Sequence, residues 1–508
     1  MARMVDVGSQ PDLSLGDGKL RVSGNCILSD VHDSIFLTPS ETNQGTFIGV
    51  KADHQRRSRV VFPVGKLKGL RILCLYRFKL WWMTQCMGTC GQDIPCETQF
   101  LMVEVPDSCQ FGEETEGGEG LSKPVYYTVF LPILEGDFRA VLQGNAHDEL
   151  QICLESGDPS VQEFEGRHLV YVAAGVDPYN VIEKSIKSLE THLKTFRHRD
   201  NKEMPDMLNW FGWCTWDAFY TDVTAEGVKK GINSLEKGGA RPKFVIIDDG
   251  WQSVAMDPTS SEAKCEDSAN DKPGNHDFDV LKKLVLPDGS TLRAKLPGRP
   301  ARDCLFSDPT RDGKSLLKIW NMNDFTGVLG VFNCQGASWC QVTIKNLIHD
   351  EQPETISGTV RATDVEYLGS IAESGCPGDC VMYSHRGGKL IYVPENTSLP
   401  IQLKAREYEV FTVVPVKKLS NGAAFAAIGL INMFNSGGAI KEINYERNIN
   451  LSVRGRGIFG AYSSVRPKRI IIETLEEEFD YDERSGLVTL TLRVPAEDLY
   501  QWNITIEV

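Results

Sequence analysis

Long apolar runs are missing from this sequence, since no stretch reaches the roughly 20 residues that a membrane-spanning helix requires. The start of the chain, Met1 to Asp6, also lacks the apolar core of a secretory signal. Positive charge is scarce, because 54 basic side chains face 69 acidic ones and leave a net charge of −15. The electrostatic field of such a negative protein repels the phosphate backbones of nucleic acids. We therefore predict a cytoplasmic protein, with a plastid location left open, that has neither a membrane nor a nucleic acid as partner.

Signatures of several enzyme classes are missing as well. The sequence has no G-x-S-x-G elbow, no H-E-x-x-H pair and no G-x-G-x-x-G loop after a strand. Serine hydrolases, zinc proteases and dinucleotide-binding enzymes therefore lack their first requirement. The 14 cysteines are too dispersed for a disulfide scaffold and form no C-x-x-C pair. We expect reduced thiols, no metal and no cofactor.

The 508 residues that are present suffice for about three domains. In residues 1–180, short apolar runs such as Val60 to Val64 and Tyr127 to Leu131 alternate with turn residues, which predicts packed strands. In residues 181–206, apolar side chains recur every three or four positions from Val181 to Phe196. This spacing predicts a helix that joins two domains.

The pattern changes in residues 207–300. An apolar run from Leu208 to Trp216 precedes a helical stretch from about Thr224 to Lys237, and a second strand is expected from Lys243 to Ile247. A helix between two such strands predicts a right-handed crossover with parallel strands. Residues 301–508 return to short β-like runs, such as Tyr408 to Val416, and predict an all-β domain.

Two adjacent carboxylates follow the second of these strands. Asp248 and Asp249 stand between Ile247 and Gly250-Trp251, at the strand end where α/β barrels carry their chemistry. A pair of aspartates that merely caps the loop is the simple alternative. Asp217, after the first strand, and the indole of Trp251 favour a sugar site, because carboxylates accept hydroxyl hydrogens and indoles stack on sugar rings.

Longer motifs of the sequence resemble those of a known protein family. The segments at 209–220, NWFGWCTWDAFY, and 244–252, FVIIDDGWQ, resemble the plant raffinose synthase and alkaline α-galactosidase family, above all its seed imbibition proteins. Further similar segments lie at 80–83, 133–140 and 409–416, so the resemblance covers almost the whole chain. It implies a glycoside hydrolase family 36-like enzyme that moves α-galactosyl groups from donors such as galactinol or raffinose to sucrose or water.

The resemblance also implies a multidomain fold, with an N-terminal β-sandwich, a (β/α)8 TIM barrel and a C-terminal all-β domain. Its implied partners are small galactosides, namely galactinol, sucrose and raffinose. Asp248 and Asp249 match the pair that holds the galactose hydroxyls, and Trp216 and Asp217 match residues at the sugar pocket. Together with Trp251 these are the predicted substrate-binding residues.

The barrel of this chain is predicted to be incomplete. Up to about Cys265 the chain resembles the family's second barrel strand and the loop after it, whereas the segment from Asp271 resembles the part after the last barrel strand. Met207 to Pro300 spans 94 residues, while an eight-stranded barrel takes roughly 250. We therefore predict only a remnant of the barrel.

The family's catalytic carboxylates would lie in the absent part. Retaining glycosyl transfer needs a nucleophile and an acid/base carboxylate about 5 Å apart. The resemblance places them in a K-x-D stretch and an S-D-D-F-like stretch. Here the K-x-D ends at Asp53, in an expected surface turn, and Asp308 lacks the following Asp and is expected at the entry of the last domain. We therefore predict no catalytic residue.

The leading hypothesis is thus an inactive homologue of this family, truncated inside its barrel. Two alternatives stay open. One is a galactoside-binding or regulatory protein that never catalyses the reaction. The other is an enzyme that has rebuilt its carboxylate pair from Asp217, Asp248 or Asp249.

Overall fold

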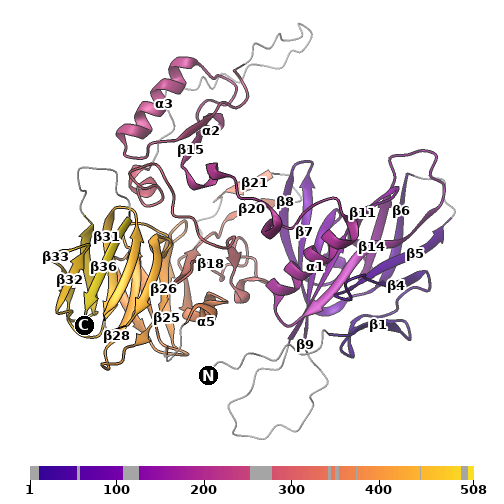
Figure 1. Ribbon diagram of the computed structural model, residues 1–508. Helices are drawn as coiled ribbons and strands as arrows, with labels where there is room; N and C mark the ends of the chain where they lie inside the picture. The colour runs from indigo at the N-terminus through magenta and orange to yellow at the C-terminus, as the bar shows by residue number, and fades with distance from the viewer. Residues whose placement is uncertain are drawn as a thin grey trace, which may run out of the picture. The chain divides into compact units, whose positions relative to one another are not determined.

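The computed structural model describes residues 11–53, 58–106, 125–251, 277–340, 345–348, 354–372, 376, 378–446, 448–492 and 501–508. Strands predominate over helices (Figure 1). The chain divides into unit 1, Met1–Glu203 with Leu305–Asp308, and unit 2, Met204–Cys304 with Pro309–Val508. The finer division into residues 1–180, 181–206, 207–300 and 301–508 stays a prediction. No described helix is long and apolar enough to cross a membrane.

Unit 1 is built on an antiparallel sheet of eleven strands in the order β4-β5-β14-β10-β9-β12-β13-β6, with β7 and β8 attached to β9 and β11 attached to β12. The strands are β4 (Ile35–Pro39), β5 (Thr46–Asp53), β6 (Arg59–Lys66), β7 (Lys68–Lys79), β8 (Trp82–Cys90), β9 (Thr98–Pro106), β10 (Val125–Pro132), β11 (Leu134–Glu135), β12 (Phe138–Gly144), β13 (Glu149–Glu155) and β14 (Phe164–Gly175). A separate small sheet holds β1 (Leu13–Gly16), β2 (Lys19–Val22) and β3 (Asn25–Leu28).

Both faces of this sheet are covered, which explains its continuous apolar runs. In β10, Phe130 enters one buried cluster, whereas Val129 and Leu131 enter another, because successive side chains point to opposite faces. β9 joins β12 through the single pair Thr98 and Leu142, and strands on both sides of this junction contribute to the first cluster. The sheet therefore curls around one core, while the predicted β-sandwich stays a prediction.

Helix α1 (Pro178–Leu193) covers the second cluster. The Asp177 side chain accepts two backbone N–H bonds of the first turn, and Lys194 ends the helix in the left-handed conformation, with φ 58°. Val181 and Leu189 are buried against the sheet. The predicted helix is confirmed, although it begins earlier than predicted, and it packs on the sheet of unit 1. Its role as a link between two domains stays a prediction.

Most of unit 2 is antiparallel β structure. One sheet has six strands in the order β17-β18-β19-β26-β23-β24, and two sheets have five, β27-β28-β31-β35-β34 and β29-β30-β36-β32-β33. The strands are β17 (Arg299–Pro300), β18 (Leu317–Met322), β19 (Gly327–Phe332), β20 (Ala337–Cys340), β21 (Lys345–Ile348), β22 (Ile356–Arg361), β23 (Cys380–Ser384), β24 (Lys389–Val393), β25 (Ser398–Leu403), β26 (Tyr408–Pro415), β27 (Lys417–Lys418), β28 (Ala424–Leu430), β29 (Ile440–Tyr445), β30 (Ile449–Arg454), β31 (Gly457–Ser463), β32 (Arg469–Ile472), β33 (Leu475–Glu477), β34 (Asp480–Asp482), β35 (Leu487–Leu492) and β36 (Gln501–Glu507).

β28 connects the cores of these sheets. Phe425 and Ala427 join the cluster between the two five-stranded sheets, while Ala426 and Ile428 join a cluster with β23 and β24. Leu286, from the segment before β17, also enters the first of these clusters. The short helix α5 (Leu368–Ile371) belongs to this part of the chain. Single 3-10 turns lie at Gly91–Asp93, Arg199–Asn201, Asp206–Asn209, Arg302–Cys304, Ala362–Asp364 and Ser436–Ala439.

The predicted strand, helix and strand of residues 207–300 form a small parallel unit. β15 (Gly212–Cys214) pairs with β16 (Phe244–Ile246), and α3 (Ala225–Lys237) lies between them in the chain. The Thr224 hydroxyl accepts the Gly227 N–H and starts α3. A Cβ at Gly231 would lie 2.2 Å from the Trp213 ring, so glycine lets α3 pack on β15. The short helices α2 (Trp216–Phe219) and α4 (Phe278–Leu281) complete this part.

Candidate functional site

The candidate site lies at the carboxyl ends of β15 and β16, where Cys214 stands opposite Ile246. Beyond these residues the strands stay connected. Thr215 N donates to Ile246 O at 3.1 Å, and Asp248 N donates to the buried Thr215 Oγ1 at 3.0 Å. The two strand ends therefore place Asp248 beside Cys214 and Thr215.

The carboxylate of Asp248 is held from two directions. Cys214 Sγ donates to Oδ2 at 3.3 Å, and Asp249 N donates to Oδ1 at 2.7 Å. Gly250 N in turn donates to Asp249 Oδ1 at 3.0 Å. Such bonds are what a loop-capping pair makes, but a carboxylate oxygen has two lone pairs and can accept a sugar hydroxyl as well. The geometry is therefore compatible with both interpretations of the aspartate pair.

Gly250 fixes the course of the chain after the two aspartates. Its φ of 95° is rarely adopted by residues with a side chain. A Cβ atom there would lie 2.3 Å from the carbonyl carbon of Thr221, between α2 and α3. The loop after β16 can therefore approach the α2–α3 connection only with glycine at this position.

Trp216 and Asp217 open α2, directly after the first strand. The Trp216 ring meets the Tyr220 ring edge-on at 5.5 Å, and Trp251, at the end of the described loop, is 70% exposed. Among the described residues, neither Asp217 nor Trp251 forms a hydrogen bond with Asp248. The structure thus places all five predicted residues on two neighbouring strand ends, with the indoles open to solvent.

Cys214 and Thr215 were not predicted as site residues, although their contacts orient Asp248. Their position at the end of β15 could have indicated them, since neighbouring parallel strands end at the same edge of a sheet. What the sequence does not give is the direction of a thiol or a hydroxyl toward a residue on the next strand.

The parallel pair has no further parallel strand beside it in the part of the chain that the structure describes. Ile246 and Ile247 are 47% and 44% exposed. In a closed α/β barrel such side chains are covered, either by the packed interior or by the outer helices. Apolar side chains of this strand pair are therefore exposed among the described residues, and the remnant of a barrel stays a prediction.

The two aspartates of the implied catalytic motifs belong to a different unit from Asp248. Asp53 is the last residue of β5 and not part of a turn as predicted, and it belongs to unit 1. Asp308 also belongs to unit 1, directly before Pro309, where unit 2 resumes. Asp248 lies in unit 2.

Strand-end carboxylates beside exposed indoles are typical of sugar sites in barrel enzymes. The sequence model of the family described as "Raffinose synthase or seed imbibition protein Sip1" matches residues 13–271 and 265–492. The chain belongs to this family. It is similar to "Probable galactinol–sucrose galactosyltransferase 1" of Arabidopsis thaliana, with 38% identity over 97% of this chain and 99% of that protein. "Probable galactinol–sucrose galactosyltransferase 6" of the same plant is 34% identical, over 96% and 98%.

A solved structure, the galactosidase domain of an α-galactosidase-sucrose kinase, is also similar, with 8% identity over 80% of this chain and 86% of that chain. Its TM-score is 0.30, which does not establish a shared fold.

The alignments place the difference in length inside the chain. The first alignment spans 756 positions, whereas this chain has 508 residues, so at least 248 positions (756 minus 508) face no residue of this chain. Because 99% of the relative is covered, these positions lie within it and not at its ends. The family match also restarts at residues 265–271, within a segment outside the described residues.

Proposed function

We propose that this chain is a non-catalytic homologue of the galactinol–sucrose galactosyltransferases in raffinose-family oligosaccharide metabolism. The observation that carries the proposal is the parallel pair β15–β16, which has no further parallel strand beside it among the described residues and exposes Ile246 and Ile247, just before the point at which the family match breaks. The segment that this break omits is the one in which the resemblance places both catalytic carboxylates.

The remaining carboxylates cannot take over the reaction. Retaining transfer needs a nucleophile on one side of the scissile bond and an acid/base group on the other. Asp248 and Asp249 are consecutive in one loop and are joined through the Asp249 N–H. This is the arrangement of a loop-capping pair and not of two carboxylates on opposite sides of a scissile bond.

An activity assay on the purified full chain tests this proposal. We expect neither hydrolysis of an aryl α-galactoside nor formation of raffinose from galactinol and sucrose. The pea galactinol–sucrose galactosyltransferase, measured in parallel, shows that the assay works. Turnover that survives repurification and disappears in Asp248→Ala would contradict the proposal and support a rebuilt carboxylate pair.

A second candidate function is weak galactoside binding. The supporting observation is the position of Asp248, which Cys214 and Thr215 fix without a ligand. A one-sided site leaves its polar groups in competition with water, where a hydrogen bond contributes only about 1 kcal/mol. Two or three such bonds with one stacking contact correspond to a dissociation constant of about 1 mM.

Calorimetric titration with galactose and galactinol measures how strongly the site binds. The proposal predicts at most millimolar affinity in the wild type. Micromolar, saturable binding that is lost in Asp249→Ala and kept in Asp206→Ala, an exposed control, would make a dedicated galactoside-binding protein the better description.

A further inference from the structure

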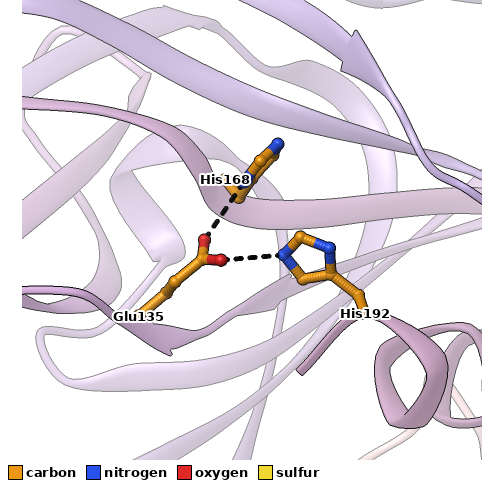
Figure 2. A group of neighbouring side chains, drawn as sticks. All are labelled: Glu135, His168 and His192. Carbon is orange, nitrogen blue, oxygen red and sulfur yellow. Dashed lines mark hydrogen bonds and ion pairs between the residues drawn. The ribbon is translucent and has the colours of Figure 1, made fainter. Parts of the chain in front are cut away.

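Three side chains of unit 1 converge outside the candidate site (Figure 2). Glu135 ends β11, His168 lies in β14 and His192 lies in the last turn of α1. His168 Nδ1 is 3.2 Å from Glu135 Oε2, and His192 Nε2 is 3.0 Å from Glu135 Oε1. One ligand atom from each residue lies within 4.8 Å of the others. No spacing motif marks this group, because its members come from three separate elements.

One side of the group packs on an aromatic ring, and the other side is open to solvent. The buried Phe47 ring lies 4.8 Å from the His168 ring and 4.6 Å from the His192 ring, centroid to centroid. The side chains of Glu135 and His168 are 37% and 29% exposed, and that of His192 is 11% exposed. The imidazoles are therefore held in place by packing, while water and ions can reach the carboxylate.

No protein cation neutralises this carboxylate, since Glu135 pairs with neither Lys nor Arg among the described residues. A second group of unit 1, formed by Glu183, His198 and Asp200, shows the contrast. There Lys187 Nζ lies 2.9 Å from Glu183 Oε1 and 3.2 Å from Asp200 Oδ2. That group has its own cation, whereas the Glu135 group has none.

Two imidazole nitrogens and one carboxylate are a common ligand set for zinc and similar divalent metals. Bonds of about 2.0 to 2.2 Å in a tetrahedral site separate neighbouring ligand atoms by roughly 3.3 Å. The nitrogen–oxygen distances of 3.0 and 3.2 Å are close to this value. The two distances go to different oxygens of Glu135, so the carboxylate would bind one ion with both oxygens or turn to present one of them.

We propose that Glu135, His168 and His192 bind a divalent transition metal of the zinc type. The metal takes the place of the hydrogens between the two ring nitrogens and the carboxylate, and each imidazole keeps its one N–H hydrogen on the other ring nitrogen, so that both histidines bind as neutral ligands. Water from the open side fills the remaining coordination position. Because the ligands come from β11, β14 and α1, the bound metal fastens α1 to the sheet.

Titration of the chelator-stripped full chain with zinc chloride and cobalt chloride tests the proposal. We expect one metal per chain with micromolar or tighter affinity, visible absorption bands of four- or five-coordinate cobalt, and a higher temperature of thermal unfolding. Glu135→Gln and His168→Gln should each bind about 100-fold more weakly. His147→Gln, at an exposed histidine, should bind like the wild type.

Two outcomes overturn the proposal. One is a folded wild type without saturable binding, and the other is Glu135→Gln with unchanged affinity and a circular dichroism spectrum like that of the wild type. Because the wild type itself must bind, a variant that fails to fold does not protect the proposal.

Discussion

His385 is buried in unit 2, with its Nε2 2.9 Å from Thr412 Oγ1 and 3.2 Å from Ser436 Oγ. Burial, assisted by the charge of Lys283, lowers the pKa of its imidazole from 6.5 to about 4. Between these two values the unfolded chain takes up a proton that the folded chain does not. The free energy of unfolding should therefore fall as the pH decreases through this window, by about 1.4 kcal/mol per pH unit from this group.

Urea unfolding at pH 7.5 and pH 5.0 checks this prediction. We expect His385→Gln to lose about 1 to 2 kcal/mol less than the wild type between these two values. His32→Gln, at an exposed histidine, should behave like the wild type. Equal losses in His385→Gln and the wild type would show that His385 does not control the acid response.

Lys318 is the buried cation of unit 2, and its Nζ lies 2.5 Å from Asp303 Oδ2 and 2.9 Å from Asp364 Oδ2. Its side chain is 7% exposed and that of Asp364 is 10% exposed. Lys318→Met should lower the free energy of unfolding by about 3 kcal/mol or more, because the buried Asp364 would lose its cation and keep only the backbone N–H of Arg361.

Denaturant titration at pH 7 measures this effect. Replacing both partners, in Lys318→Met with Asp364→Leu, should recover part of the loss, since no unpaired buried charge remains. Lys314→Met, at an exposed lysine, should change stability by less than about 0.5 kcal/mol. A single variant as stable as the wild type would contradict this role of Lys318.

At the scale of elements, the β15–β16 pair has no further strand beside it among the described residues and carries exposed apolar side chains. Unpaired apolar strands are templates for association. Ile246→Lys should therefore lower light scattering of concentrated protein and increase the monomer fraction in size-exclusion chromatography. Ile458→Lys is the matched control, because Ile458 is 42% exposed but lies on β31, which is paired on both sides. Equal effects of both changes would indicate a general effect of charge.

The spacing of apolar residues along the sequence predicted most helices and strands, because α1, α3 and the strands of both units bury one face or both. The run from Leu208 to Trp216 was predicted less well. It forms a 3-10 turn at Asp206–Asn209, the three-residue strand β15 and the start of α2. Strand length depends on partners elsewhere in the chain, which a local pattern does not contain. The same limit applies to the Cys214 thiol at Asp248 and to the meeting of Glu135 with two distant histidines.

At the scale of the whole molecule, the chain joins two parts of a family sequence that the family keeps apart. The junction lies in residues 252–276, outside the described residues. We expect limited proteolysis to cut first between Ser253 and Asn275 and to leave larger protected pieces on both sides, which mass spectrometry can identify. Uniform resistance across this junction would mean that the remaining strands have found a different packing.

We propose, above all, that the chain has no nucleophile for galactosyl transfer. Retaining transfer passes through a covalent glycosyl-enzyme, so a mechanism-based α-galactoside inactivator labels a functional nucleophile even when turnover is slow. Intact-mass spectrometry of the full chain after incubation with such an inactivator is the most direct test. We expect an unchanged mass under conditions in which a retaining α-galactosidase, used as the positive control, gains one label per chain. A single label on this chain that maps to Asp217, Asp248 or Asp249 would contradict it.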